Sequence, residues 1–327
     1  MSIDRRFLNW GIFLVLLGGI PLAVNQNWLD RSALSDLWRL WPLLLIGAGI
    51  GLILARTPLA AVGGVVVAGT FGVLLGGLLA SGFSLTIPGC GSTGNLQRVA
   101  ERTGTFEGSA TVSLELDCGR LDVGAVDGSG WRVTADAADP DQAPDIETSS
   151  TRLSVRPASD GRIWIFPFTS NGAQTWQVDL PRATPIVLGV TVNAGDATFD
   201  PDGAALDSVG LTLNAGRMVL DLETTRVGRL STTVNAGELR LSLPASGTTG
   251  SITVNAGSVR LCATPGVGLR LDASGGFASS NNFGSAGLVQ DGGAWVSAGY
   301  ASAKALVDLR LTGNAASFSL NPGEGCR

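Results

Sequence analysis

Four copies of one short phrase constrain how this chain can fold. They read VTVNAGDATF, LTLNAGRMVL, TTVNAGELRL and ITVNAGSVRL, and they lie between residues 190 and 262. Their asparagines are Asn193, Asn214, Asn235 and Asn255, so the spacings are 21, 21 and 20 residues. A period of about 20–21 residues in a stretch rich in Gly and β-branched residues predicts a single-stranded β-helix, or β-solenoid, with coils of that length.

Each copy has apolar residues at fixed positions on both sides of the Asn. In the second copy these residues are Leu211, Leu213, Met218 and Leu220. Alternation before the Asn predicts a strand with one buried face. The inward parity then changes across Asn-Ala-Gly, which predicts a corner or bulge, and Gly supplies the backbone freedom that a corner needs. The corner glycines are Gly195, Gly216, Gly237 and Gly257.

The repeated asparagines allow two interpretations. One is a structural corner ladder, in which each side-chain amide bonds to the next coil. The other is a polar row that binds sugars. We favour the ladder, because the apolar pattern around the asparagines accounts for them fully.

Composition narrows the class of protein. The chain has 327 residues, of which 45% are hydrophobic and 15% charged, and it contains no His. Average soluble domains carry about a quarter charged residues, so we expect part of this chain to lie in lipid. The net charge of −5 argues against nucleic acid as a partner, because nucleic-acid binding needs a basic face. Without His, Ser-His-Asp and Cys-His catalysis and the commonest zinc ligand are absent, so we expect no enzyme, no cofactor and no metal site.

Residues 1–85 are predicted to form a transmembrane anchor. Apolar runs cover about residues 7–24, 38–55 and 58–83, lengths that suit membrane spans. No small-residue cleavage site follows the first run, so we expect that run to remain as a span. No span carries a charged residue in its middle, which favours an anchor over a transport path.

The arginines around the spans predict an orientation. With three spans, Arg5, Arg6 and Arg56 fall on one side, which the excess of basic residues in cytoplasmic loops identifies as the cytoplasm. The chain after residue 83 is then extracytoplasmic, and the protein is a multi-pass protein of a bacterial cytoplasmic membrane. If the third run were a re-entrant pair, the C-terminal domain would instead be cytoplasmic.

Two glycine pairs, Gly47/Gly51 and Gly72/Gly76, have the small-xxx-small spacing that lets helices approach closely. We favour packing between helices of one chain; packing between chains is the alternative.

The membrane segment resembles the paired-helix module of LiaF-like proteins. The likeness rests on LLGGIPLAVNQNW followed by LWRLWPLLLIGAGIGLILA, in which Trp41 and Pro42 stand where that module has its W-P. It covers about residues 7–55. The third apolar run departs from the two-helix module.

Residues 86–99 are predicted to be a linker, residues 100–322 the β-solenoid domain, and residues 323–327 a C-terminal tail. Weaker copies of the coil pattern occur at 114–123, 269–277 and 310–320, and less regular strands are expected between 131 and 181. With one coil per repeat, a domain of this length has on the order of ten coils. At the usual strand spacing of about 4.8 Å, these coils form a rod of roughly 50 Å. We expect capped ends, because an open solenoid edge invites aggregation.

This domain resembles the toast-rack, or putative-adhesin, β-solenoid family that often follows LiaF-like helices in bacterial envelope proteins. The residues that carry the likeness are WQVDLP at 176–181 and the NAG coils after it. It covers about residues 100–320. The resemblance implies an envelope context and a non-enzymatic role.

The cysteines Cys90, Cys118, Cys262 and Cys326 all lie in or beside the predicted external domain. An even count outside the cytoplasm indicates two disulfides, with three possible connectivities. Solenoid coils touch only their neighbours, so we prefer Cys90–Cys118 and Cys262–Cys326, one near each end. The alternative for Cys118 is a free, buried small residue.

Three further motifs have a functional and a structural interpretation. The stretches DATFDPDG (196–203) and DAADPDQAPD (136–145) have carboxylates at spacings that Ca²⁺ can use, but Asp, Pro and Gly are also ordinary turn residues, which we favour. Trp164, Phe166 and Phe168 would share one strand face. We expect them to be buried under a cap; an exposed patch for a glycan or protein partner is the alternative.

These patterns predict a membrane-anchored envelope protein that acts by binding, as a scaffold or interaction surface, with a role in envelope stress sensing as one form of it. Its partner would be another envelope or signalling protein, or cell-wall glycan. An adhesin or glycan-binding module is the alternative function. A β-helix carbohydrate enzyme is the least favoured, because the coil faces show no converging carboxylates.

Overall fold

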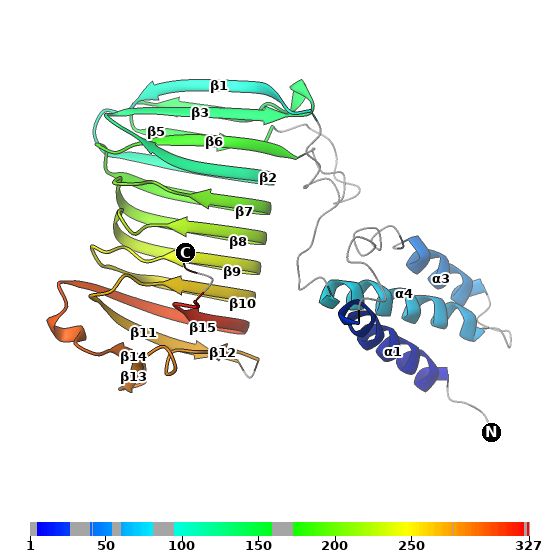
Figure 1. Ribbon diagram of the computed structural model, residues 1–327. Coiled ribbons are helices and arrows are strands. Elements are labelled where there is room, and N and C mark those ends of the chain that lie inside the picture. Colours follow the sequence, from blue (N-terminus) through cyan, green and yellow to red (C-terminus); the bar gives the residue numbers. More distant parts are fainter. Residues whose placement is uncertain are drawn as a thin grey trace. The chain divides into compact units, whose positions relative to one another are not determined.

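The computed structural model describes residues 5–26, 40, 42–53, 60–80, 95–158, 173–276, 278–323 and 326. The chain divides into two compact units, Met1–Thr86 and Ile87–Arg327. The first unit is helical and the second consists of β-strands (Figure 1).

In the described residues of the first unit, three helices fall within, or nearly within, the three apolar runs. They are α1 (Arg5–Asn25), α3 (Pro42–Ile53) and α4 (Ala60–Ala80). Across the part of the chain that the structure describes, none of the helices has the length and hydropathy required of a membrane span.

Both glycine pairs lie where helices of this unit pack together. A Cβ placed on Gly76 of α4 would lie 2.8 Å from the carbonyl oxygen of Leu16 in α1. A Cβ placed on Gly63 of α4 would lie 2.4 Å from the Cα of Gly51 in α3 and 2.6 Å from the carbonyl oxygen of Gly47. The pairs therefore serve packing within one chain, because only Gly permits backbones to approach this closely.

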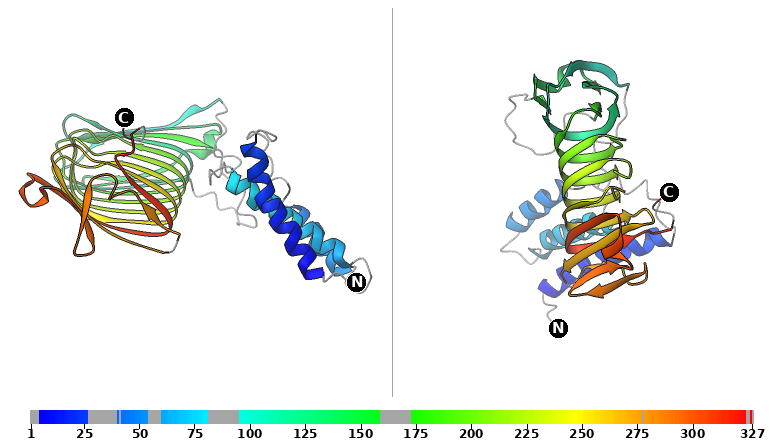
Figure 2. Two further views of the ribbon diagram at one scale, coloured as in Figure 1. Left: turned by 60° about the horizontal axis from the view of Figure 1, so that its bottom comes forward. Right: turned by 90° about the vertical axis from the view of Figure 1, so that its left-hand side faces the viewer.

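The second unit is one 15-stranded sheet coiled into a solenoid. Its parallel rungs are, in spatial order, β2 (Ala110–Val126), β7 (Ile186–Phe199), β8 (Ala205–Asp221), β9 (Arg226–Ser242), β10 (Thr248–Cys262), β15 (Ala305–Leu320) and β11 (Val267–Gly275). Figure 2 shows these rungs stacked one on another. Each full rung is a long strand with a corner, which is Asn-Ala-Gly in β7 to β10, Asp-Cys-Gly at 117–119 in β2 and Asn-Ala-Ala at 314–316 in β15.

The rungs stack in register, so equivalent residues of successive coils lie side by side. Gly195 faces Gly216, Gly216 faces Gly237, and Gly237 faces Gly257. The inward side chains fill the core, and Leu213, for example, is completely buried. Burial of these apolar rows is the main source of stability in the stack.

In β7 to β10 the corner requires glycine for two reasons that are visible at Gly216. Its φ of 128° lies in a region that L side chains rarely adopt. A Cβ there would also lie 1.9 Å from the carbonyl oxygen of Gly195 in the preceding rung. The same geometry recurs at Gly195, Gly237 and Gly257.

Irregular strands close both ends of the stack. Before the first full rung lie β1 (Gln97–Thr105), β3 (Gly130–Ala137), β4 (Asp145–Ser149), β5 (Arg152–Arg156) and β6 (Gln174–Pro181), with the short helix η2 (Pro140–Gln142). At the other end lie β12 (Ser280–Asn281), β13 (Leu288–Asp291), β14 (Ala294–Ser297) and the short helix η3 (Tyr300–Ser302). β1 pairs antiparallel with β3, and β13 with β14, so the sheet ends in antiparallel strands.

One expectation about the stack was wrong, and the order of the rungs adds a feature that was not predicted. Among the described residues the number of parallel rungs is smaller than ten, because 97–105, 130–137 and 288–297 form antiparallel cap strands with no full coil. The rungs also depart from chain order, because β15 is inserted between β10 and β11. Cys118 and Cys262 lie four rungs apart, on β2 and β10.

Candidate interaction surface

The corner asparagines form a continuous ladder of side-chain hydrogen bonds. Asn214 Nδ2 donates to Asn193 Oδ1 at 2.7 Å, and Asn235 Nδ2 donates to Asn214 Oδ1 at 2.6 Å. Asn255 Nδ2 continues the ladder to Asn235 Oδ1 at 2.6 Å. Each amide thus donates to the preceding rung and accepts from the following one.

Two further residues complete the ladder. At one end Asn193 Nδ2 donates to Asp117 Oδ1 at 2.8 Å, so the first member needs only an acceptor. At the other end Asn314 of β15 donates to Asn255 Oδ1 at 2.8 Å, although the two residues are 59 positions apart in sequence. Asp117 lies in the weaker copy of the coil pattern at 114–123, and Asn314 lies in the copy at 310–320. Asn314 lies beside Asn255 because β15 is inserted next to β10.

A row of threonines runs beside the asparagine ladder on the outer surface. We call this row, the ladder beside it and the glycine–serine row on its other side the threonine face. Its central row consists of Thr191, Thr212, Thr233, Thr253 and Thr312, which face one another in register and are each half-buried. The next outward row consists of Gly189, Gly210, Ser231 and Ser251. From β7 to β10 these two rows and the ladder carry no charge, and parallel strands repeat them at about 4.8 Å.

The outer surface beyond the corner is different, because it is charged. We call it the charged face. Asp196, Arg217 and Glu238 lie side by side on successive rungs with alternating sign. Arg217 Nε lies 3.4 Å from a Glu238 carboxylate oxygen, and Arg260 forms a closer ion pair with the same carboxylate. Such exposed pairs contribute little to stability, so this face is ordinary solvated surface.

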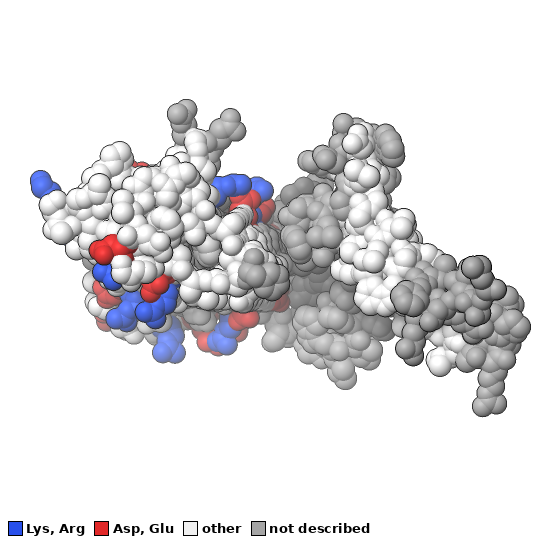
Figure 3. Space-filling model, turned by 90° about the horizontal axis from the view of Figure 1, so that it is seen from below, with Lys and Arg blue, Asp and Glu red and all other residues white. Residues whose placement is uncertain are grey.

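Charge is also grouped at the end of the stack. Seen from the β13–β14 end, Lys, Arg, Asp and Glu gather in groups of mixed sign separated by uncharged surface (Figure 3). No single sign dominates the visible face, which fits poorly with a polyanionic partner.

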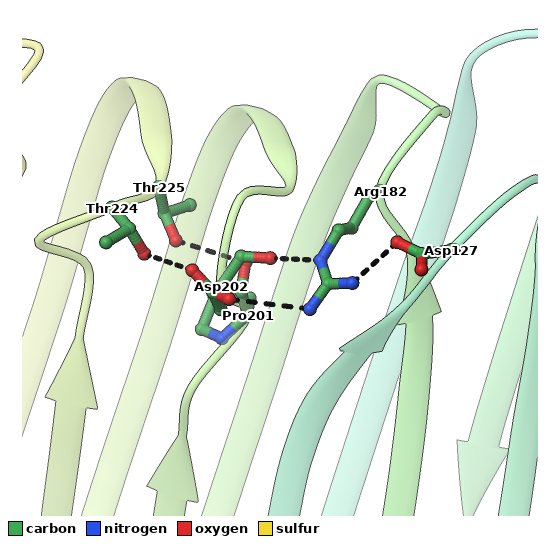
Figure 4. Close-up of polar contacts among 6 residues, drawn as sticks. All are labelled: Asp127, Arg182, Pro201, Asp202, Thr224 and Thr225. Carbon is green, nitrogen blue, oxygen red and sulfur yellow. Dashed lines mark hydrogen bonds and ion pairs between the residues drawn. The ribbon is translucent and has the colours of Figure 1, made fainter.

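Arg182 links the irregular cap to the regular coils (Figure 4). Its Nη1 lies 2.6 Å from Asp127 Oδ1 in the β2–β3 turn, and its Nε donates to the Asp202 carbonyl oxygen at 2.6 Å. The hydrogen bond to Asp127 raises the pKa of Arg182 above its ordinary value. Thr224 Oγ1 then donates to Asp202 Oδ1 at 2.6 Å and extends the contacts to the next turn.

Each acidic stretch combines strand residues with a turn, because 196–199 belong to β7, 136–137 to β3 and Asp145 to β4. In the 196–203 stretch, the Asp202 carboxylate is engaged by Arg182 and Thr224. In the 136–145 stretch, Asp136 pairs with Arg98, and Asp139 caps η2 by accepting from the Asp141 amide at 3.0 Å. Within the described ranges, no group of three or more metal-ligating side chains comes together.

One open hollow lies between the turns, with a volume of about 470 Å³. Asp207 and Arg226 are its charged lining residues, and Ser246 and Gly247 also line it. Its described lining has no pair of carboxylates, so it offers no acid–base pair for glycoside cleavage.

The two cysteines that lie on rungs are both disulfide-bonded. Cys262 on β10 forms a disulfide with Cys326, with the Cα atoms 5.4 Å apart. Cys118 on β2 is also disulfide-bonded. Cys90, the partner predicted for Cys118, lies outside the described residues, as do Trp164, Phe166 and Phe168.

Two family models match the chain. Residues 10–53 match the LiaI-LiaF-like transmembrane region. Residues 98–243 match the N-terminal domain of toast_rack, DUF2154. No curated protein matches the chain.

Solved structures of bacterial proteins align with most of the chain. A "putative cell adhesion protein" from Clostridium sporogenes aligns at 12% identity and a TM-score of 0.46, over 68% of this chain and 99% of its own. A "putative adhesin" from Bacteroides fragilis aligns at 7% identity and a TM-score of 0.29, over 68% and 96%. Another from Parabacteroides merdae aligns at 10% identity and a TM-score of 0.27, over 71% and 98%. The two family matches identify this chain as a LiaI-LiaF-like transmembrane region followed by a toast-rack domain.

Proposed function

We propose that this chain is a non-enzymatic, membrane-anchored protein of the bacterial envelope whose β-solenoid presents an interaction surface outside the cytoplasm. The LiaI-LiaF-like match supports membrane association of the N-terminal region. The positions of Arg5, Arg6 and Arg56 support an extracytoplasmic solenoid. Disulfide-bonded cysteines in the solenoid agree with that compartment, because disulfides persist where the environment is oxidising.

The threonine face carries the proposal. Soluble protein surfaces usually carry about 25–35% charged residues, which keep them solvated and apart. From β7 to β10, the glycine–serine, threonine and asparagine rows of this face carry none, while the charged face of the same rungs follows the ordinary pattern. The ladder and the in-register stack also hold the face flat and rigid, so little entropy is lost when a partner binds. These properties suit recognition of a large, neutral, extended partner.

A non-enzymatic role agrees with the chemistry of the described surface. The chain has no His, and Glu238 on the charged face is occupied by two arginines. General acid–base catalysis needs titratable groups that converge on one point, and the outer rows of the coils do not converge.

A pair of matched variants tests the proposal in the full-length, membrane-embedded protein. T191K/T212K places two charges on the threonine face of β7 and β8, and T198K/V219K places two charges on the charged face of the same rungs. In-cell crosslinking of the unmodified chain should give a discrete adduct with an envelope protein, identified by mass spectrometry. T191K/T212K should reduce the adduct at least fivefold, and T198K/V219K should leave it unchanged. Equal loss in both variants, or no adduct with the unmodified chain, would contradict the proposal.

A glycan partner is the second candidate, and the face itself is what favours it. Each rung from β7 to β10 offers at least one hydroxyl and one amide at a fixed spacing, which is hydrogen-bonding chemistry that neutral polysaccharide can use. The same two variants separate the candidates. Sedimentation with purified wall polysaccharide that is lost in T191K/T212K alone would favour the glycan, and protein crosslinking without sedimentation would favour the protein partner.

A further inference from the structure

The last strand of the chain fills a slot between two strands that are consecutive in sequence. β15 pairs along its length with β10 on one side, where Ile252 faces Leu311 and Val259 faces Phe318. On its other side it pairs with β11, where Leu271 faces Leu309. Figure 1 shows β15 lying between β10 and β11.

Without β15, the slot would have two unpaired strand edges. β10 and β11 are joined by a short turn, and among the described strands β10 otherwise pairs only with β9, and β11 only with β14. Unpaired strand edges are templates for another strand of matching pattern. β11 cannot close the slot alone, because it ends at Gly275, before the part of the rung that pairs with Ser317–Leu320 of β15.

β15 matches the slot on both of its surfaces. Its inward residues Val307, Leu309, Leu311 and Phe318 are buried in the core. Its outward Asn314 continues the asparagine ladder from Asn255. A strand that fills this slot must therefore carry the chain's own coil pattern, and a second copy of the chain is the partner that supplies it.

A disulfide and two hydrogen bonds hold the end of β15 against the end of β10. The Cys262–Cys326 disulfide joins the two, across 64 residues of sequence. Beside it, the Asn321 amide donates to the Leu261 carbonyl oxygen at 2.8 Å, and the Ala263 amide donates to Asn321 Oδ1 at 2.8 Å. Asn321 has a φ of 46°, a turn conformation that Asn tolerates. Without the disulfide, hydrogen bonds and apolar burial alone retain the strand.

We propose that β15 is an exchangeable strand, and that opening the Cys262–Cys326 disulfide lets it enter the slot of a second copy to give a reciprocal strand-exchanged dimer. A dithiol supplies the two electrons and two protons that convert the disulfide to two thiols, and the dithiol becomes a cyclic disulfide. Both copies keep the same strand pairings, so the exchange costs little once the strand is released. Anchoring in one membrane raises the effective concentration of the second copy.

The experiment uses two full-length versions with tags of different mass, both carrying C262S/C326S. One also carries S258C and the other S317C, because Ser258 and Ser317 face each other across β10 and β15. After the two are co-reconstituted in vesicles and oxidised, a crosslinked species of the summed mass should form. Restoring Cys262 and Cys326 should lower its yield at least tenfold.

Two controls interpret the result. E238C in one version and S258C in the other report on β9 and β10, which are neighbours in sequence and do not exchange. S258C/S317C within one chain shows that β15 still occupies its rung. Crosslinking between copies at the β10–β15 pair alone supports the proposal. Crosslinking only within one chain, or equally at both pairs between copies, would overturn it.

Discussion

Each asparagine amide of the corner ladder from β7 to β10 donates a hydrogen bond to the preceding rung and accepts one from the following rung. The direction of these hydrogen bonds can be tested at one residue. N214D removes the donor that bonds Asn193 and brings a carboxylate against an amide oxygen. We expect a loss of about 1–3 kcal/mol in the free energy of unfolding, because a partly buried acceptor is left without its donor. D117N is the matched control: Asp117 only accepts, and an amide oxygen accepts equally well. Denaturant titration of both variants measures the difference; a larger loss for D117N would contradict the ladder's direction.

A second residue-scale prediction concerns a polar atom in the core. Thr232 is 2% exposed and its hydroxyl has no hydrogen-bond partner among the described residues, while Leu211 and Ile252 hold the same position in the neighbouring rungs. T232V should therefore raise the free energy of unfolding by about 1 kcal/mol. T233V, on the outer surface one position on, should change it by less than about 0.5 kcal/mol. A destabilised T232V would show that the hydroxyl is satisfied in solution.

At this scale the sequence was most informative where a residue repeats with the coil. The spacing of Asn193, Asn214, Asn235 and Asn255 predicts their stacking, because equal spacing places equal residues on successive rungs. The Arg182–Asp127 contact was not predictable, because it joins a cap turn to a coil across 55 residues and belongs to no repeat.

At the scale of elements, the helical unit depends on close backbone approach. G76L places a side chain where Leu16 and Leu17 carbonyl oxygens already lie within about 3 Å of a Cβ, so α1 and α4 must separate. We expect the thermal midpoint of the helical signal in nanodiscs to fall markedly. G49L is the control, since a Cβ at Gly49 meets nothing within 4 Å. Equal midpoints for the two variants would mean that Gly76 does not support this packing.

The position of β15 between β10 and β11 could not be predicted from the period of the repeat. The coil pattern identifies 310–320 as a rung, but it does not say which rung lies beside it. Leu309 of β15 and Leu271 of β11 are both buried at the same inward position of the coil. The local pattern therefore fits either strand as the neighbour of β10. In the structure β15 lies beside β10, where the Cys262–Cys326 disulfide joins the ends of the two strands.

For the whole molecule, stability should be distributed rung by rung. The disulfide closes a loop of 64 residues and so restricts the unfolded chain. C262S/C326S should therefore lower the free energy of unfolding by about 4 kcal/mol. The loss should be confined to the C-terminal end, because solenoid rungs interact mainly with their neighbours. Hydrogen exchange should therefore speed up in β15 and β11 and stay unchanged in β7 and β8. A uniform increase along the stack would contradict a rung-by-rung account.

The proposed function requires the solenoid to lie outside the cytoplasm, and one labelling measurement tests this directly. A245C places a single thiol in the exposed turn between β9 and β10 of the full-length protein. A membrane-impermeant maleimide should label it in intact cells, while R56C, predicted to be cytoplasmic, should be labelled only after lysis. Labelling of A245C only after lysis would place the solenoid in the cytoplasm and contradict the proposed envelope role.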